Sequence, residues 1–358
     1  MWKKKTLFFL ITYSLLLAVI IVINVWVDPF MHYHAPLADS FYYELDNERS
    51  MNDGITRHFD YDAIITGTSM SENFMVSEAE ELWDYTFCKI PFSGGSYKEV
   101  DDAVERALHR KDVKLVIRSI DPVYLMEEPD AMADFFDGYP DYLCDDSVFN
   151  DVEYVLNKDV LLGRSVPMLA GGLLGRRGIA SLDGYANNSF GAEYGAEAVL
   201  AEHKPFTIES QQVKLTDIEK AQLNLSIEQN LIDVPQANPQ TCFCYFIPPY
   251  SAVYWGDLSE RGDREKIIDA EEYLVERLLE QSNVKAYAWD TDYEVTQDLD
   301  NYKDYGHYSG TINSWILQQI KSDHGLITKD NCKAYFDELR SQYANYDYNA
   351  LFTQLEKE

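Results

Sequence analysis

The sequence predicts a three-layer α/β fold in which five parallel strands are joined by crossover helices. Short apolar runs alternate along the chain with longer amphipathic stretches, and most of these runs stop at glycine, proline or serine. The chain has 358 residues, 46% of them hydrophobic and 14% aromatic, so one large domain can bury a core. This composition excludes an intrinsically disordered chain despite its high charge.

An uncharged, mostly apolar run begins at Thr6 and ends at Val27, and it predicts a membrane-spanning helix. At about 1.5 Å per residue it can cross a hydrocarbon core of roughly 30 Å. Lysines at positions 3–5 precede the run and Asp28 follows it, which keeps the N-terminus cytoplasmic and exports the remainder. A cleaved signal peptide is the alternative, but its apolar region is about 7–15 residues long and ends at a small-residue site. We expect residues 1–28 to be a cytoplasmic tip and a single-pass anchor in the lipid bilayer.

The charge of the chain excludes nucleic acid as a partner. There are 30 basic and 61 acidic residues, a net charge of −31, and no basic cluster offers a footprint for phosphates. Three of the basic residues precede the apolar run, so the exported part carries 27 basic against 61 acidic residues, a net −34. Solubility and repulsion between copies explain this charge most simply.

The first half of the sheet is predicted between residues 60 and 125. Strands are expected at 63–66, 87–92 and 113–117. Helices are expected at 77–83, where Ser77 and Glu80 have capping-box spacing, and at 96–109. A linker at 29–59 precedes this half.

The second half of the sheet follows an insertion at about 125–238. Strands are expected at 242–247 and 284–289, with helices at 265–280 and 309–321, which completes a domain at 60–325. A helical tail is expected at 326–358. Within the insertion, 150–164 and 214–232 are predicted to be helical. The apolar stretch 166–174 is too short to span a membrane, and core packing is favoured over contact with the bilayer surface.

No metal or cofactor is expected. The five cysteines are an odd number and do not indicate a disulfide scaffold. Cys242 and Cys244 share one face of a predicted strand and are interpreted as buried thiols, because a zinc site lacks partners.

Three motifs are predicted to meet at the carboxyl edge of the sheet, where open α/β sheets bind ligands. Asp304-Tyr305-Gly306-His307 precedes a helix, and its three-residue spacing lets the carboxylate orient the imidazole. Ser69 follows the first strand directly after Gly67 and Thr68. Gly94 lies in a Ser-Gly-Gly-Ser loop after the second strand, where backbone N–H groups suit an oxyanion hole.

Taken together, these motifs resemble the SGNH/GDSL hydrolase superfamily, whose sheet is flavodoxin-like. The first block matches 64–69, the glycine block 90–95 and the last block 304–307, so the resemblance covers about 60–125 and 240–322. It implies Ser69 as the nucleophile, His307 as the general base and Asp304 as its orienting partner. It also implies the N–H groups of Ser69 and Gly94 as oxyanion donors.

The chain departs from the family pattern at two positions. Thr68 replaces the usual aspartate, and Asp121 or Ser119 stands near the place of an asparagine that normally completes the oxyanion hole. An ionised carboxylate opposes an oxyanion, and losing one donor costs about 10²–10³ in rate. A hole built from backbone alone, a protonated Asp121 and an inactive site are the three alternatives.

Two further features are interpreted as substrate contacts. Tyr250, Tyr254 and Trp255 follow the fourth strand and can form an aromatic platform for sugar rings, although core packing is the competing explanation. Arg118 ends a buried strand and requires an anion, either a substrate group or an internal carboxylate such as Asp121.

An anchor joined to an exported SGNH-like domain is similar to the membrane-bound branch of the superfamily that transfers D-alanine in teichoic acid synthesis or acetyl groups to exported polysaccharides. The resemblance implies a serine acyltransferase or esterase that acts on a cell-envelope glycan and can receive its acyl group from a membrane-embedded partner. The net charge favours a neutral glycan. The alternative is a non-catalytic scaffold or glycan-binding accessory protein.

Overall fold

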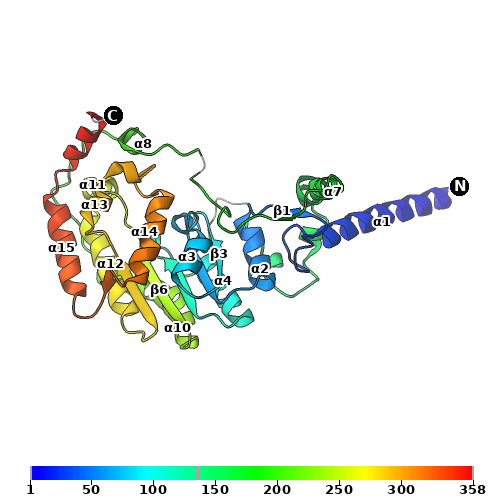
Figure 1. Cartoon of the computed structure of the whole chain (residues 1–358), viewed down its shortest axis with the longest axis horizontal. Coiled ribbons are helices and arrows are strands. Elements are labelled where there is room, and N and C mark those ends of the chain that lie inside the picture. The colour runs from blue at the N-terminus through cyan, green and yellow to red at the C-terminus, as the bar shows by residue number, and fades with distance from the viewer. Residues whose placement is uncertain (1, 134–137, 190, 357–358) are drawn as a thin grey trace. The chain divides into compact units, whose positions relative to one another are not determined.

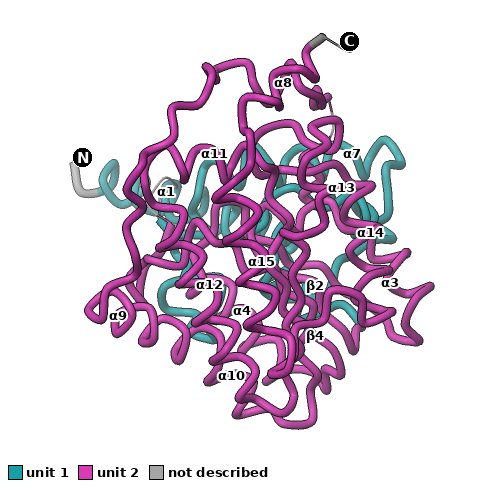
Figure 2. The backbone as a smooth tube through the Cα atoms, turned by 90° about the vertical axis from the view of Figure 1, so that its left-hand side faces the viewer, with its two compact units in different colours: residues 1–60, 135–185 teal, residues 61–134, 186–358 magenta. Residues whose placement is uncertain are grey.

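The computed structural model describes residues 2–133, 138–189 and 191–356. The chain divides into two compact units, shown in separate colours in Figure 2. Unit 1 comprises residues 1–60 and 135–185, and unit 2 comprises residues 61–134 and 186–358. The predicted insertion at about 125–238 is therefore not one body, because residues 135–185 belong to unit 1, while its first residues and residues 186–238 belong to unit 2 with the sheet.

Unit 1 contains the long N-terminal helix α1 (Trp2–Val27), which is drawn in blue in Figure 1. This helix is long and apolar enough to cross a membrane, as predicted, although a signal sequence has the same character. The other elements of the unit are α2 (Glu48–His58), η3 (Asp141–Leu143), α5 (Val152–Val155), α6 (Lys158–Val160), η4 (Leu161–Ser165), α7 (Val166–Leu173) and the parallel pair β1 (Tyr42–Tyr43) and β5 (Gly178–Ile179).

The side chain of Asp28 holds the chain in place directly after α1 by accepting hydrogen bonds. This carboxylate is fully buried and accepts hydrogen bonds from the backbone N–H groups of His32, Tyr33 and His34 and from the Tyr154 hydroxyl. A carboxylate with four donors can be buried at little cost. Residues 29–59, expected as a linker, are thus a folded part of unit 1.

Unit 2 is an α/β domain with a mostly parallel mixed sheet, which confirms the α/β part of the predicted fold class. The sheet order is β3-β2-β4-β6-β7-β8. Its strands are β2 (Ala63–Gly67), β3 (Phe87–Pro91), β4 (Leu115–Ser119), β6 (Cys242–Ile247), β7 (Val284–Ala288) and the antiparallel β8 (Leu326–Ile327). The prediction of five strands is wrong by one. The two-residue β8, at the start of the expected tail, is too short to show any periodicity.

The helices of unit 2 cover both faces of this sheet. They are η1 (Ser69–Ser71), α3 (Val76–Leu82), α4 (Tyr97–Arg110), η2 (Pro122–Tyr124), α8 (Ala196–Leu200), α9 (Asp217–Ile227), η5 (Glu228–Ile232), α10 (Asp233–Ala237), α11 (Ala252–Arg261), α12 (Arg264–Leu278), α13 (Tyr293–Thr296), η6 (Leu299–Asn301), α14 (Gly310–Lys321), α15 (Cys332–Asn345) and η7 (Tyr348–Glu356). The strand order reverses at β2, so right-handed crossovers place α3 and α4 on opposite faces. Helix α14 packs with α3, and α15 packs with α12.

Two local predictions are corrected by the structure. Ser77 and Glu80 form no capping box, since α3 begins at Val76 and the Glu80 carboxylate instead accepts the N–H of Phe87. Helix α7 buries none of its side chains, so the apolar stretch 166–174 does not pack in a core.

Candidate active site

Ser69 lies at the carboxyl edge of the sheet because β2 ends in a conformation that only glycine adopts freely. Gly67 has φ 139°, and a Cβ at this position would lie 2.0 Å from Ser119 Oγ. The chain then turns through Thr68 into η1, which begins at Ser69 and leaves this side chain partly exposed. A strand followed by a tight turn therefore presents one hydroxyl at the edge.

Substituting Gly67 by alanine is expected to destabilise unit 2. The left-handed backbone and the contact with Ser119 should together cost about 2–4 kcal/mol of unfolding free energy. Gly310→Ala is the matched control. Gly310 has no positive φ, and a Cβ added there would lie 3.9 Å from the nearest atom, the Asn73 carbonyl oxygen. Urea unfolding of both variants measures the difference; equal stability would contradict the strain assigned to Gly67.

His307 reaches Ser69 from the loop between β7 and α14. Its Nε2 lies 2.7 Å from Ser69 Oγ, although 238 residues separate the two in the sequence. On the other side of the ring, Nδ1 lies 2.8 Å and 3.1 Å from the two carboxylate oxygens of Asp304. The structure therefore brings the three predicted residues into one hydrogen-bonded chain, with each within the reach that proton transfer requires.

The Asp304 carboxylate is held by the backbone as well as by the imidazole. Its Oδ1 accepts the N–H groups of Gly306 and His307, at 2.9 Å and 2.8 Å. Burial raises the pKa of Asp304, but the hydrogen bonds and charge of His307 outweigh it, so the pKa is lowered overall. Asp304 is thus ionised at neutral pH and favours the tautomer of His307 in which Nδ1 carries the proton.

If the hydrogen-bonded series catalyses acyl transfer, as proposed below, Asp304→Asn should lower turnover by about 10²–10⁴-fold while the fold persists. The asparagine Oδ1 can still accept the two backbone N–H groups, but its amide can present a donor to Nδ1 and so favour the wrong tautomer of His307. Steady-state kinetics with a chromogenic ester measures the loss, and circular dichroism checks the fold. Turnover equal to that of wild type would remove Asp304 from the mechanism.

The glycine loop after β3 lies beside the Ser69 turn. The N–H of Phe92 donates to the Gly67 carbonyl at 2.9 Å, so the two loops leave the sheet together. Gly94 has φ 56°, in the left-handed region. Within the described residues, no hydrogen bond uses the backbone N–H of Gly94 or of Ser69. Both groups remain available to an oxyanion.

Asp121 is not an oxyanion donor in this structure, which corrects the interpretation of that position. Its side chain is buried and accepts hydrogen bonds from three hydroxyl groups, those of Thr68 at 2.6 Å, Tyr250 at 2.9 Å and Ser119 at 3.2 Å. Burial raises the pKa of Asp121, against the lowering effect of these hydrogen bonds. The carboxyl group braces the turn beneath Ser69.

Arg118 is likewise not placed to contact a substrate. It is 1% exposed, and its guanidinium donates to Asp101 Oδ1 at 3.1 Å and to the carbonyls of Tyr97 and Asn230, each at 2.9 Å. The anion that it requires is therefore the internal carboxylate of Asp101, and not Asp121. Helix α4 supplies this partner from the layer that covers β4.

The expected aromatic platform is mostly core. Tyr250 is buried, with its hydroxyl bound to Asp121, and Trp255 is buried in a stack on Tyr343. Tyr254 lines a cavity of about 380 Å³ together with Tyr305, which is 43% exposed and nearly parallel to it at 6.2 Å between ring centroids. Among the described residues, neither Ser69 nor His307 lines this cavity, which adjoins the site through the residue next to Asp304.

Sequence reasoning missed two side chains that support the Ser69 turn. The Asn188 amide donates to the Glu72 carboxylate and, at 3.4 Å, to the Ser69 carbonyl. Lys303 Nζ donates to Asn188 Oδ1 at 2.9 Å, which links the turn to the loop that carries His307. Asn188 comes from the insertion, and no local pattern distinguishes it there. Tyr305, in contrast, was visible within the last motif.

The described residues hold no group of three metal-ligating side chains that could bind an ion. No family model matches the chain, and comparison with curated proteins found no match. A function is therefore assigned from the structure. Its α/β domain holds a serine, a histidine and an aspartate that are hydrogen-bonded in series at the edge of the sheet.

Proposed function

We propose that the protein is a membrane-anchored, extracytoplasmic serine acyltransferase or esterase with an SGNH-like fold. The observation that carries the proposal is the hydrogen-bonded series in which Ser69 Oγ lies 2.7 Å from His307 Nε2, and His307 Nδ1 lies 2.8 Å from Asp304. The order of the five parallel strands, β3-β2-β4-β6-β7, supports a flavodoxin-like sheet with its site at the carboxyl edge.

The geometry supports a two-step acyl transfer. In the first step His307 Nε2 takes the proton of Ser69 as Oγ attacks the acyl carbonyl, and the resulting oxyanion can be met by the N–H groups of Gly94 and Ser69. The intermediate then expels the alcohol, which leaves with the proton from His307. In the second step water or a sugar hydroxyl gives its proton to His307 and attacks the acyl-enzyme. The intermediate then breaks its bond to Ser69 Oγ, which takes the proton back from His307 as the acyl product leaves.

A neutral cell-envelope glycan is the substrate class that the surroundings favour. Tyr305 offers an exposed ring beside the cavity, and aromatic faces suit sugar rings. The cavity wall carries cations and anions in balance, with Arg261 and Lys266 against Asp257 and Asp263. A wall of this kind suits hydroxyl groups better than a densely anionic polymer. The acyl group would come from a membrane-embedded donor.

Labelling with a fluorophosphonate probe tests the nucleophile. Wild-type protein should become covalently labelled, and Ser69→Ala should lose the label. Ser93→Ala, which alters another partly exposed serine in the glycine loop, is the matched control and should retain it. Absence of labelling in folded wild-type protein, or equal labelling of Ser69→Ala, would overturn the assignment.

Transfer and hydrolysis differ in the acceptor. For a transferase, a neutral glycan added to protein and acyl ester should raise the rate of ester consumption and yield acylated glycan. For an esterase, the rate should stay unchanged and free acid should be the product. Mass spectrometry of the glycan distinguishes the two activities.

The second candidate is a non-catalytic accessory protein, and the position of Asp121 favours it. A buried carboxyl group stands near the place where the family has an asparagine donor, so any oxyanion hole is left with backbone donors alone. A protein of this kind would bind a neutral glycan in calorimetry and yet give no ester turnover and no labelling of Ser69.

A further inference from the structure

We infer that the segment η4–α7 is a second membrane-contacting element, which lies in the lipid interface beside the exit of α1. This inference rests on the proposal that α1 spans the membrane. Lipid would then contact an apolar helix face that unit 1 leaves uncovered.

The uncovered face of this segment is continuous and apolar. Leu162, Val166, Ala170 and Leu173 follow one another at intervals of three or four residues, so they share one side of the helix, and all are exposed. Leu162 is 64% exposed, and Leu173 and its neighbour Leu174 are 89% and 84% exposed. Such a row in water would be unfavourable, since each leucine side chain gains about 1.5–3 kcal/mol on burial.

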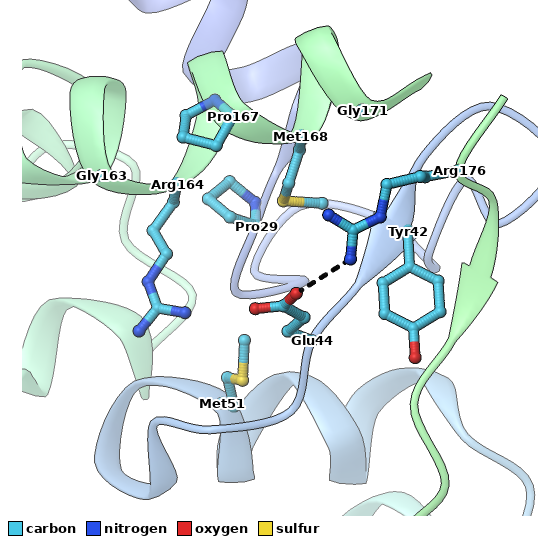
Figure 3. Close-up of a pocket in the computed structure, with 10 residues that line it drawn as sticks. All are labelled: Pro29, Tyr42, Glu44, Met51, Gly163, Arg164, Pro167, Met168, Gly171 and Arg176. Atoms are coloured by element: carbon cyan, nitrogen blue, oxygen red, sulfur yellow. Dashed lines mark ion pairs between the residues drawn. The ribbon is translucent and has the colours of Figure 1, made fainter. Parts of the chain in front are cut away.

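The opposite side of the segment packs on unit 1. Ser165 is fully buried, and a Cβ at Gly172 would lie 2.5 Å from the Ser40 carbonyl, so the helix lies against the chain at this point. Met168 and Pro167 roof a small cavity of about 90 Å³, with Arg164 and Arg176 on opposite sides of it (Figure 3). The apolar row is therefore held outward by a fixed inner face.

Hydrogen bonds to α1 set the level of this row. Ser165 Oγ donates to Asn24 Oδ1 at 2.8 Å, and Asn24 Nδ2 donates to the Val155 carbonyl of α5 at 3.0 Å. Asn24 is three residues from the end of α1, so these contacts fall about 4.5 Å inside it along the helix axis. If α1 crosses the bilayer, η4 lies at the depth of its last turn, where the exposed Trp26 also marks the interface.

The charges around the segment fit an anionic lipid surface. Residues 158–177 contain four basic side chains, Lys158, Arg164, Arg176 and Arg177, and one acidic side chain, Asp159, in a chain whose net charge is −31. Basic residues at the ends of an apolar helix face are typical of helices that lie in the interface. Arg164 and Arg176 are partly neutralised by Asp46 and Glu44, so Lys158 and Arg177 are the principal contacts expected with headgroups.

A second exposed apolar segment comes just before α5, the helix that accepts a hydrogen bond from Asn24 of α1. Phe149 is 94% exposed, and it precedes α5, whose Val155 carbonyl accepts the hydrogen bond from Asn24. Val148 and Val152 are exposed beside it in the sequence. Helix α5, which this exposed segment leads into, is thus joined to α1 through Asn24.

Fluorescence quenching in vesicles tests this inference on the full-length protein. Single cysteines replace Leu173, Leu16 in the middle of α1, or Ile218, an 83% exposed residue of α9 that serves as the matched control. The partly buried Cys144 and Cys242 are changed to serine in every sample. Each protein is labelled with a polarity-sensitive dye and inserted into vesicles of phosphatidylcholine and phosphatidylglycerol that carry nitroxide-labelled acyl chains.

The dye at Leu173→Cys should shift to the blue and be quenched most by nitroxides near the glycerol end of the acyl chain. The dye at Ile218→Cys should do neither. Quenching at Leu16→Cys with no quenching at Leu173→Cys would overturn the inference and leave the anchor intact. A blue shift at Leu173→Cys without quenching would show that protein, such as a second copy, covers the row. No quenching at Leu16→Cys would overturn the anchor and this inference together.

Discussion

Replacing His307 by alanine is expected to lower the turnover of an ester substrate by about 10⁴- to 10⁶-fold. His307 is the general base in the proposed reaction, and its Nε2 is the atom that lies 2.7 Å from Ser69 Oγ. Without it the hydroxyl keeps its proton, and a neutral alcohol is a weak nucleophile. The rate is measured by stopped-flow or steady-state assay with a chromogenic ester.

The matched control is His109→Ala. His109 is an exposed histidine on α4 that is paired with Glu105, and its loss should leave turnover unchanged. Because members of a catalytic series act as a unit, the double variant Ser69→Ala/His307→Ala should be no slower than Ser69→Ala alone. Additive losses in the double variant, or full activity in His307→Ala, would contradict the proposed relay.

Arg118→Met is expected to reduce the free energy of unfolding by about 3–5 kcal/mol. The substitution leaves the Asp101 carboxylate buried without its cation, and it removes the donors to the Tyr97 and Asn230 carbonyls. Burial already raises the pKa of Asp101 to about 7 even with Arg118 present, so an unpaired carboxylate at this position should take up a proton. Urea unfolding followed by circular dichroism measures the loss.

Two variants show whether the loss comes from the buried pair. Arg118→Met/Asp101→Asn removes both charges and should recover part of the stability. Lys333→Met breaks an exposed ion pair with Asp337 on α15 and should cost less than about 1 kcal/mol. If Arg118→Met were as stable as wild type and only the KM for substrate rose, Arg118 would be a substrate contact after all.

Most of the sheet could be predicted because its strands carry local signals. Strand β6 and helix α14 begin and end at or within one residue of the predicted positions, since an apolar run bounded by proline and an amphipathic period bounded by serine are visible in the chain. Strand β4 begins two residues later than predicted, because its start depends on pairing with β2 and β6. Pairing is a property of neighbouring strands and not of one segment.

Part of the site could be predicted for the same reason. Asp304 and His307 are three residues apart, so one turn brings them together whatever the remainder of the chain does. Ser69 meets them only because β2 and β7 end at the same edge of one sheet. The parallel order makes that edge common to all of the predicted motifs.

The sequence by itself determined the apolar N-terminal helix, the alternation of strands and helices, and the three motifs at the strand ends, since each depends on residues that are close in the chain. Tertiary structure alone decided which charged and aromatic side chains are buried. Arg118 pairs with the buried carboxylate of Asp101, and Asp121 accepts hydrogen bonds from three hydroxyl groups. The apolar side chains of α7 are not buried. Burial and ion pairing depend on which segments, far apart in the sequence, pack against each other in space. That packing cannot be read from the local pattern of one sequence.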